Sequence, residues 1–197
     1  MTHAVNDDAL ETLFRKARTH RSWRPGEVTP QMLMAIYDLA RWGPTTNNTS
    51  PGRFVFIVSK DAKERLKPYL TKGNTEQTMK APATAIIAYD LQFYEKMGKL
   101  SPNPTARETW MQKTPAELEV AAFRNSSLQG GYFIMAARAI GLDCGPMSGF
   151  DNEGVDKEFF AGTAVKSNFL CNLGFGDEQA LRPRAGRLDF DEACKIL

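Results

Sequence analysis

The 197-residue sequence contains only two histidines and three cysteines. Two histidines cannot supply an HExxH motif or a three-histidine metal site, and a serine-histidine-aspartate relay would have to depend on His20. Cys144, Cys171 and Cys194 are widely spaced and form no CxxC pair, which excludes a zinc ribbon and disfavours a disulfide framework. We therefore expect no metal ion and assign the protein to a reducing cytoplasm.

Other classes of protein are excluded by what the sequence lacks. No apolar run approaches the ~18 residues of a membrane-spanning helix. The N-terminus has neither the basic region nor the apolar run of a signal peptide. The 25 basic and 23 acidic residues leave a formal charge of +2, without the basic excess of a dedicated nucleic-acid binder. We expect neither a membrane nor a nucleic acid as partner.

The remaining composition is that of an ordinary globular domain, with 42% hydrophobic and 24% charged residues. Its length fits a single domain spanning residues 1–197. Apolar periodicity and capping signals predict helices, and short runs of β-formers predict strands. The expected helices cover about residues 7–18, 30–42, 60–70, 114–140 and 151–160 and the C-terminal DEACKIL; the expected strands cover 53–58, 83–89 and 169–175. We expect a polar loop through Gly73 and Asn74, a loop or lid at 98–113, and a mixed α/β fold.

The helix at 114–140 has the strongest start signal. Thr114, Pro115 and Glu117 form a capping box with proline at the first helical position. The pattern continues to about residue 140, with Gly141 as the expected C′ residue, and is apolar on several sides. The adjacent Gly130 and Gly131 predict close approach of another backbone. Too little chain remains to cover this helix in a monomer, so we predict an obligate homodimer.

The familiar catalytic motifs are absent from the sequence. The Gly174-Phe175-Gly176 turn lacks the last glycine of a dinucleotide loop, and Gly145 to Gly149 does not have the spacing of a GxSxG elbow. Most carboxylates occupy helix starts or solvated faces. If the chain is an enzyme, we expect no catalytic side chain of these classes, and a bound cofactor should carry the chemistry.

Two polar clusters precede the first long strand. His20, Arg21 and Ser22 offer an imidazole, a guanidinium and a hydroxyl that suit an anion, although a solvated helix end would look the same. The second cluster is a run of hydroxyls and amides between prolines, which predicts either a stiff hydrogen-bonding loop or a plain connector. Its candidate binding residues are Pro44, Thr45, Thr46, Asn48 and Ser50.

Three more clusters follow. Asn74 and Gln77 precede the second strand and are a weak signal taken alone. Met147, Ser148 and Gly149 belong to a glycine-bounded segment where a planar ligand could approach the backbone. Arg182 and Arg184 flank a proline, which suits either a phosphate contact or a solvated basic turn.

In this order and spacing, the five clusters resemble the nitroreductase family of FMN-dependent oxidoreductases across essentially the whole chain. The resemblance implies an α+β fold with a mostly antiparallel central sheet flanked by helices, and a homodimer with FMN at the subunit interface. It implies that His20, Arg21, Ser22, Arg182 and Arg184 lie near the phosphate. The 44–50 loop would reach the partner's flavin, and the clusters at 74–77 and 147–149 would face the ring. Ser50 stands where the family usually has glutamine, and Gln77 where some members have lysine.

The resemblance also implies the reaction. NADH or NADPH would pass a hydride to flavin N5 and leave, and a small electrophile would then take its place in ping-pong order. Residues 17–23 and 42–45 are similar to the malonic-semialdehyde reductase branch, which would produce 3-hydroxypropionate. A broad nitroarene or quinone reductase is the alternative within the enzyme class, and a flavin-binding protein without physiological turnover is the alternative outside it.

Overall fold

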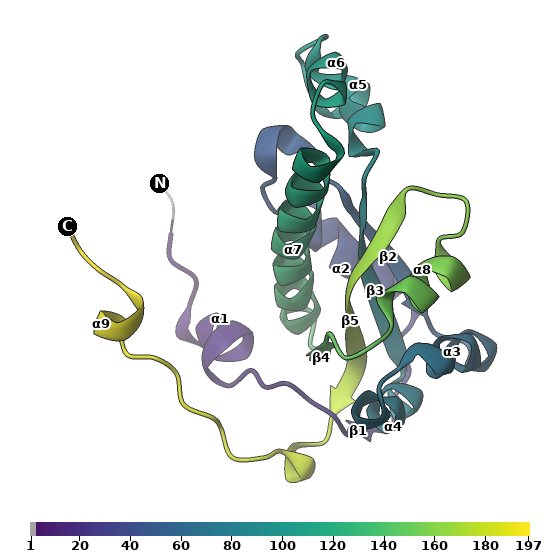
Figure 1. Ribbon diagram of the computed structural model, residues 1–197. Helices are drawn as coiled ribbons and strands as arrows, with labels where there is room; N and C mark the ends of the chain where they lie inside the picture. Colours follow the sequence, from purple (N-terminus) through teal and green to yellow (C-terminus); the bar gives the residue numbers. More distant parts are fainter. Residues whose placement is uncertain (1–2) are drawn as a thin grey trace.

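The computed structural model describes residues 3–197 and contains a five-stranded antiparallel sheet (Figure 1). The strands follow the order β1-β5-β3-β2, and β4 also pairs with β5. They are β1 Trp23–Arg24, β2 Gly52–Ile57, β3 Ala83–Asp90, β4 Asp143–Met147 and β5 Val165–Gly176. The mixed α+β class and the antiparallel sheet are confirmed.

Helices cover both faces of the sheet. The helical elements of residues 3–197 are α1 Asp7–Leu10, η1 Glu11–Arg15, α2 Pro30–Ala40, η2 Thr46–Asn48, α3 Lys60–Leu66, η3 Lys67–Tyr69, α4 Lys72–Lys80, η4 Phe93–Lys96, α5 Met97–Leu100, α6 Ala106–Met111, α7 Pro115–Ala139, α8 Asn152–Phe159, η5 Glu178–Ala180 and α9 Phe190–Ala193. Figure 1 shows α7 and α2 beside one face and α3 and α8 beside the other. None of the helices in residues 3–197 is long and apolar enough to cross a lipid bilayer.

The two faces have separate cores because neighbouring side chains of a strand point to opposite sides. Ile87 of β3 packs with Ile36 of α2 and Phe133 of α7 in the first core. The adjacent Ile86 packs on the other side, in the core formed with α3 and α8. Residues 83–88 are fully buried, which explains their continuous run of apolar residues and threonine.

The predicted long helix is confirmed as α7. Its capping box forms as expected: the Glu117 N–H donates to Thr114 Oγ1 at 3.3 Å, and the Thr114 N–H donates to Glu117 Oε2 at 2.9 Å. Gly141 ends it with a φ of +86°. The expectation of a backbone against both glycines is wrong, because a Cβ on Gly130 would meet the ring of Phe169 at 2.6 Å, whereas one on Gly131 would meet nothing within 4 Å.

Two expected loops are helical instead. The loop through Gly73 and Asn74 is the helix α4, which is held in place by tertiary hydrogen bonds to its backbone rather than by a side-chain cap. The expected lid at 98–113 contains α5 and α6, because Phe93 and Trp110 pack edge to face at 5.0 Å and anchor it to a third core.

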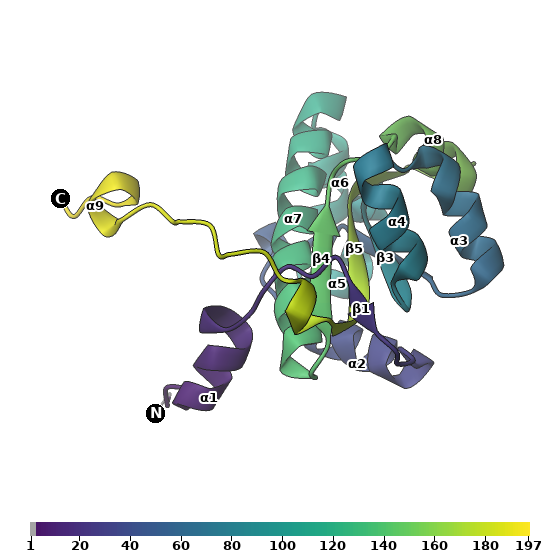
Figure 2. The same cartoon turned by 90° about the horizontal axis from the view of Figure 1, so that it is seen from below.

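The remaining differences concern the strands and the ends of the chain. Strands β1 and β4 were not predicted, and β5 extends beyond the expected 169–175. The predicted C-terminal helix is only the short α9, and η1 continues α1 as a turn of π-helix. Figure 2 shows that α1 and the C-terminal arm that carries α9 extend away from the sheet and its helices. The arm carries exposed apolar side chains, Phe190 at 60% and Ile196 at 86%.

Candidate functional site

The first predicted cluster lies where β1, β4 and β5 meet. Thr19 forms a β-bridge with Cys144, and the His20 N–H donates to the Cys144 carbonyl at 3.0 Å. The Asp177 N–H donates to the Ser22 carbonyl at 3.0 Å. These backbone bonds fix the segment that carries Arg21 between β4 and the residue that follows β5.

The three side chains of this cluster have different surroundings. His20 is 4% exposed, its Nε2 is 3.4 Å from Asp143 Oδ1, and its Nδ1 lies against Gly176 without a hydrogen-bond partner in the described chain. The imidazole therefore points into the protein. Arg21 is exposed, and neither its guanidinium nor the Ser22 hydroxyl forms a hydrogen bond within residues 3–197. Both are available to an external anion.

The late arginine pair is joined to this region by the C-terminal arm. Arg184 Nη2 donates to the carbonyls of Arg15 and Ala17 at 2.9 and 3.1 Å. Arg18 Nη2 donates to the carbonyl of Arg182 at 2.6 Å. A cation at the C-terminal end of a helix also interacts favourably with the helix dipole. The structure thus brings residues 182–184 beside residues 15–18, although they are far apart in the sequence.

The clusters at 74–77 and 147–149 contact each other directly. Asn74 Nδ2 and Thr71 Oγ1 donate to the Gly149 carbonyl at 2.9 and 2.8 Å. Gln77 Nε2 donates to Asn74 Oδ1 at 2.7 Å and lies 4.0 Å from Met147 Sδ. A Cβ at position 149 would meet Asn74 Nδ2 at 2.6 Å, so glycine is needed for this approach. The two amides are therefore fixed against the end of β4.

Trp23 joins α4 to the first cluster. Its Nε1 donates to the Gln77 carbonyl at 3.1 Å. Ser148 is exposed directly after β4, whose last residue, Met147, pairs with Leu170 of β5. The structure therefore brings together one set of predicted residues through hydrogen bonds and strand pairing: His20, Arg21, Ser22, Asn74, Gln77, Met147, Ser148, Gly149, Arg182 and Arg184.

The 44–50 loop is held elsewhere, by α7 and α5. The Thr46 N–H donates to Asn125 Oδ1 at 2.7 Å, and Asn48 Nδ2 donates to the Leu100 carbonyl at 2.9 Å. No hydrogen bond in the described part of the chain joins this loop to the first set of residues. This loop, which also carries Pro44, is thus a second group of predicted site residues. It is separate from the first group within one chain.

The conformation of this loop is strained. Asn47, Asn48 and Ser50 have φ values of 50°, 56° and 41°. Positive φ is uncommon outside glycine and is tolerated best by asparagine. The Ser50 N–H donates to Thr45 Oγ1 at 3.1 Å, which helps to hold the strained turn. Strain of this kind persists where the surrounding contacts require it, and it gathers at functional sites.

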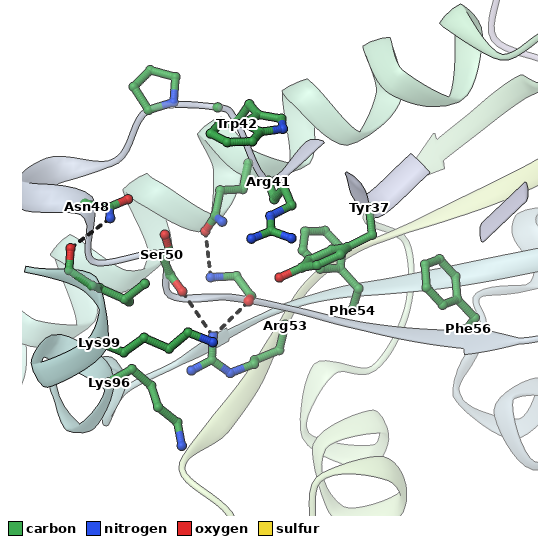
Figure 3. Close-up of a pocket in the computed structure, with 15 residues that line it drawn as sticks. Tyr37, Arg41, Trp42, Asn48, Ser50, Arg53, Phe54, Phe56, Lys96 and Lys99 are labelled. Atoms are coloured by element: carbon green, nitrogen blue, oxygen red, sulfur yellow. Dashed lines mark hydrogen bonds between the residues drawn. The ribbon is translucent and has the colours of Figure 1, made fainter. Parts of the chain in front are cut away.

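A cavity of about 700 Å³ adjoins the loop (Figure 3). Among residues 3–197, no Asp or Glu lines it, and four cationic side chains do: Arg41, Arg53, Lys96 and Lys99. Its aromatic lining comes from α2, the turn after it, and β2: Tyr37, Trp42, Phe54 and Phe56. Sequence reasoning missed these residues because they form no local motif and come from three separate segments.

Two further residues organise the cavity wall. Gln129 of α7 is 5% exposed, and its Oε1 accepts from the Gly52 N–H at 2.7 Å. Arg53 forms an ion pair with Asp90 at 2.7 Å and donates to the carbonyls of Ser50 and Gly52 at 3.1 and 2.9 Å. Figure 3 shows the two hydrogen bonds from Arg53 to the carbonyls of Ser50 and Gly52.

A buried polar network runs beneath the first group. Lys63 is 4% exposed, and its Nζ donates to Thr84 Oγ1 at 2.6 Å and to the Thr78 carbonyl at 2.8 Å. Thr84 donates in turn to Asn172 Oδ1 at 2.7 Å, and the Thr78 hydroxyl lies 3.5 Å from Met147 Sδ. Burial lowers the pKa of Lys63 to about 7. The network reaches β4 beside the candidate site.

Comparison with known proteins decides the family. The sequence model of the nitroreductase family matches residues 14–176. The chain belongs to the nitroreductase family. A relative from Stenotrophomonas maltophilia strain K279a is 53% identical over 196 residues and covers the full length of both chains. It carries the provisional name NADH dehydrogenase/NAD(P)H nitroreductase.

Solved nitroreductase structures share the fold. A nitroreductase from Bacillus subtilis has a TM-score of 0.86 at 20% identity, over 98% of this chain and 100% of that one. A nitroreductase from Exiguobacterium sibiricum, solved in complex with FMN, has a TM-score of 0.86 at 19% identity, over 100% of both chains. The expected nitroreductase-like fold is therefore confirmed.

Proposed function

We propose that this nitroreductase-family protein is an FMN-dependent oxidoreductase that takes electrons from NADH or NADPH and passes them to a small electrophile. The linkage of four distant segments carries the proposal: residues 18–23, 74–77, 147–149 and 182–184 are joined to one another by hydrogen bonds and strand pairing along β4 and the second half of β5, and they leave Arg21 without a protein partner in the described chain. The names of the Stenotrophomonas relative and the Exiguobacterium complex support it.

The residues present fit the phosphate of FMN. Arg21 is an exposed guanidinium, Ser22 has an unengaged hydroxyl within residues 3–197, and Arg184 is fixed nearby. A near-dianionic phosphate would form charge-assisted hydrogen bonds with these donors. His20 would help to bind the phosphate through its backbone, which fixes the segment that carries Arg21, and not through its imidazole, because the imidazole is directed at Asp143.

The second half of the first group fits the flavin ring. Asn74 and Gln77 are fixed amides, and the backbone of Met147 to Gly149 lies beside them. When bound, FMN supplies hydride transfer at N5, which needs stacking geometry and little acid-base help from the protein. We assign the chain's residues the tasks of binding the phosphate, orienting the ring and shaping the substrate pocket.

The electron balance is simple. One NAD(P)H and one proton convert a nitroarene to a nitrosoarene with release of one water, so two electrons pass per turnover. The finer prediction of malonic semialdehyde stays a prediction, because the relatives' names do not specify that substrate. We also propose a cytoplasmic location, which suits the free thiols of Cys144, Cys171 and Cys194.

We propose that the protein is a homodimer. Phe123, Leu128 and Tyr132 on α7 are 45–49% exposed, and Trp42 after α2 is 79% exposed. Such an apolar surface is typical of an interface. A second copy would also bring the separate 44–50 loop to the partner's flavin, as the family resemblance implies.

A spectroscopic experiment tests the function. Protein reconstituted with FMN and freed of excess cofactor should keep a yellow chromophore, and anaerobic NADH or NADPH should bleach it. A nitroarene or quinone should then restore the colour. A colourless protein would overturn the cofactor assignment, and a yellow protein that neither nucleotide bleaches would favour a flavin-binding role without turnover.

Sedimentation should give twice the 22.0 kDa chain mass, and a flavin-loaded monomer would contradict the dimer.

A further inference from the structure

We infer that the cavity of Figure 3 selects electron acceptors that combine a flat ring with a negatively charged group. Lys96 and Lys99 would face the anion, and the aromatic wall would hold the ring. The inference rests on the proposed function and on the proposed homodimer, because within one chain the cavity is separate from the residues assigned to FMN and would serve the partner's flavin.

The charge of the cavity is the first observation. Its lining includes four cations and no carboxylate. Two of the cations have a partner: Arg53 forms an ion pair with Asp90 at 2.7 Å, and Arg41 lies 3.9 Å from Asp38 and 5.8 Å from the centre of the Trp42 ring. The other two do not.

Lys96 and Lys99 form neither an ion pair nor a hydrogen bond within residues 3–197. They are three residues apart across the junction of η4 and α5, a spacing that places side chains on the same side of a helix. In Figure 3 the Lys99 side chain extends toward Arg53, whereas the Lys96 side chain extends away from it at the rim. Cations that line a concave, partly apolar site raise the local concentration of anions and speed their entry.

Gln129 supplies the second, independent observation. Its Oε1 is fixed by the Gly52 N–H, so its Nε2 is the atom left for a ligand. The side chain lines the cavity and is only 5% exposed, and its Nε2 donates to no acceptor in the described part of the chain. His20 Nδ1, and not Gln129 Nε2, is the fully buried side-chain atom without a partner in residues 3–197, so the Gln129 Nε2 is an accessible donor on the cavity wall. An acceptor oxygen of a bound molecule would satisfy it.

The aromatic lining defines the neutral part of the ligand. Tyr37 and Phe54 meet edge to face at 6.0 Å, and Phe54 stacks on Phe133 at 5.4 Å, which holds the Phe54 ring in place. Trp42 is 79% exposed beside them. Fixed aromatic faces favour a planar, conjugated molecule. The structure therefore combines ring recognition with anion recognition in one cavity.

The test compares two acceptors of similar size, 4-nitrobenzoate and the neutral 4-nitrobenzamide. Wild-type protein should show a higher kcat/KM for the benzoate, and this preference should decline between 20 and 500 mM NaCl because salt screens the lysines. Lys96→Gln/Lys99→Gln should lower the benzoate-to-benzamide ratio about three- to tenfold. Lys60→Gln/Lys157→Gln, which removes the same charge from exposed sites on α3 and α8, should leave the ratio unchanged.

Two other measurements distinguish lysines that bind the acceptor's anionic group from lysines that bind the phosphates of NADH or NADPH. Calorimetric titration of the oxidised protein with 4-nitrobenzoate should show weaker binding to Lys96→Gln/Lys99→Gln, independently of turnover. Flavin reduction by NADH and NADPH, followed alone in a stopped-flow instrument, reports on the nucleotide's phosphates. If that variant loses nucleotide affinity but keeps the benzoate ratio, the lysines serve the donor and the inference is wrong. Equal wild-type rates for both acceptors would also overturn it. Failure of NAD(P)H to bleach the flavin at all would instead overturn the proposed function.

Discussion

Replacing Lys63 by methionine should remove a pH dependence of stability that the wild-type chain carries just above neutral pH. Lys63 is 4% exposed, and no carboxylate in the described chain pairs with its ammonium. Its two hydrogen bonds go to neutral oxygens of Thr84 and Thr78. Burial therefore lowers the pKa of Lys63 from 10.5 to about 7.

The sign and size of this pH effect follow from the linkage between proton binding and folding. Between about pH 7 and 10.5 the unfolded chain holds a proton on Lys63 that the folded chain has released, so the free energy of unfolding rises with pH. With those two pKa values, the penalty for folding falls by about 1–2 kcal/mol between pH 7.0 and pH 8.5. Wild type should therefore gain about 1–2 kcal/mol relative to Lys63→Met over this range.

Other shifted groups titrate outside that range. A hydrogen bond with Cys144 and burial raise the pKa of the Cys171 thiol, so its stabilisation is lost only above about pH 9. Burial and the neighbouring Glu119 raise the pKa of Tyr89 to about 12, so its contribution is lost above about pH 10. The change in the free energy of unfolding between pH 7.0 and 8.5 thus reports on the titration of Lys63.

Urea unfolding of both proteins at the two pH values, at one protein and one FMN concentration, measures the difference. Lys60→Met, an exposed change on the same helix, should retain the wild-type gain. The 13Cε resonance of Lys63 in labelled wild-type protein should titrate near pH 7, which tests the reasoning even if the methionine variant does not fold. Equal pH slopes in wild type and variant, or a titration midpoint above pH 9, would refute it.

Three more substitutions have defined outcomes. Arg21→Ala should weaken FMN binding roughly 10- to 150-fold by flavin fluorescence titration while the fold persists, and an unchanged dissociation constant would make Arg21 a solvated surface charge. Gln129→Ala should lower the free energy of unfolding by about 1–3 kcal/mol, because a buried backbone N–H of β2 loses its acceptor; a loss under ~0.5 kcal/mol in urea would contradict this. Gly130→Ala should lower the free energy of unfolding by about 1–3 kcal/mol through a clash with Phe169. Gly131→Ala should instead raise it by up to about 1 kcal/mol. Similar shifts of the melting temperature in both variants would refute the packing argument.

The elements predicted correctly are those whose signals are local. The capping box of Thr114 and Glu117 and the stop at Gly141 depend on neighbouring residues alone, so α7 could be delimited from sequence. Residues 83–89 predicted β3 because burial on both faces leaves a continuous run of strand formers.

The elements missed depend on distant partners. Gly73 and Asn74 are poor helix formers, and α4 is held by distant segments: Asn74 donates to the Gly149 carbonyl, and Trp23 and Lys63 donate to carbonyls farther along the helix. Strand β4 contains a glycine and Pro146 and forms because β5 pairs along its whole length. Helices α5 and α6 likewise depend on the packing of aromatic side chains.

The site shows the same division between local and distant signals. The order of the clusters from His20 to Arg184 was enough for the family resemblance, because each cluster is a short local string. The cations of the cavity were not found, because Lys96 and Arg53 become neighbours of one space only after the chain has folded. Ligand-binding residues of this kind carry no pattern that a single sequence can display.

The separation of the two groups within one chain gives the proposed dimer a chemical role. The first group is fixed by β4 and β5 beyond the C-terminal end of α7, whereas the 44–50 loop bonds to Asn125, 15 residues before Ile140 and thus about 22 Å along the helix axis. In a two-fold dimer each chain would supply the phosphate and ring contacts of one site and the loop and cavity of the other, which makes two equal sites. The exposed apolar face of α7 and the basic cavity beside the loop would then have one common explanation, because the second copy would complete both.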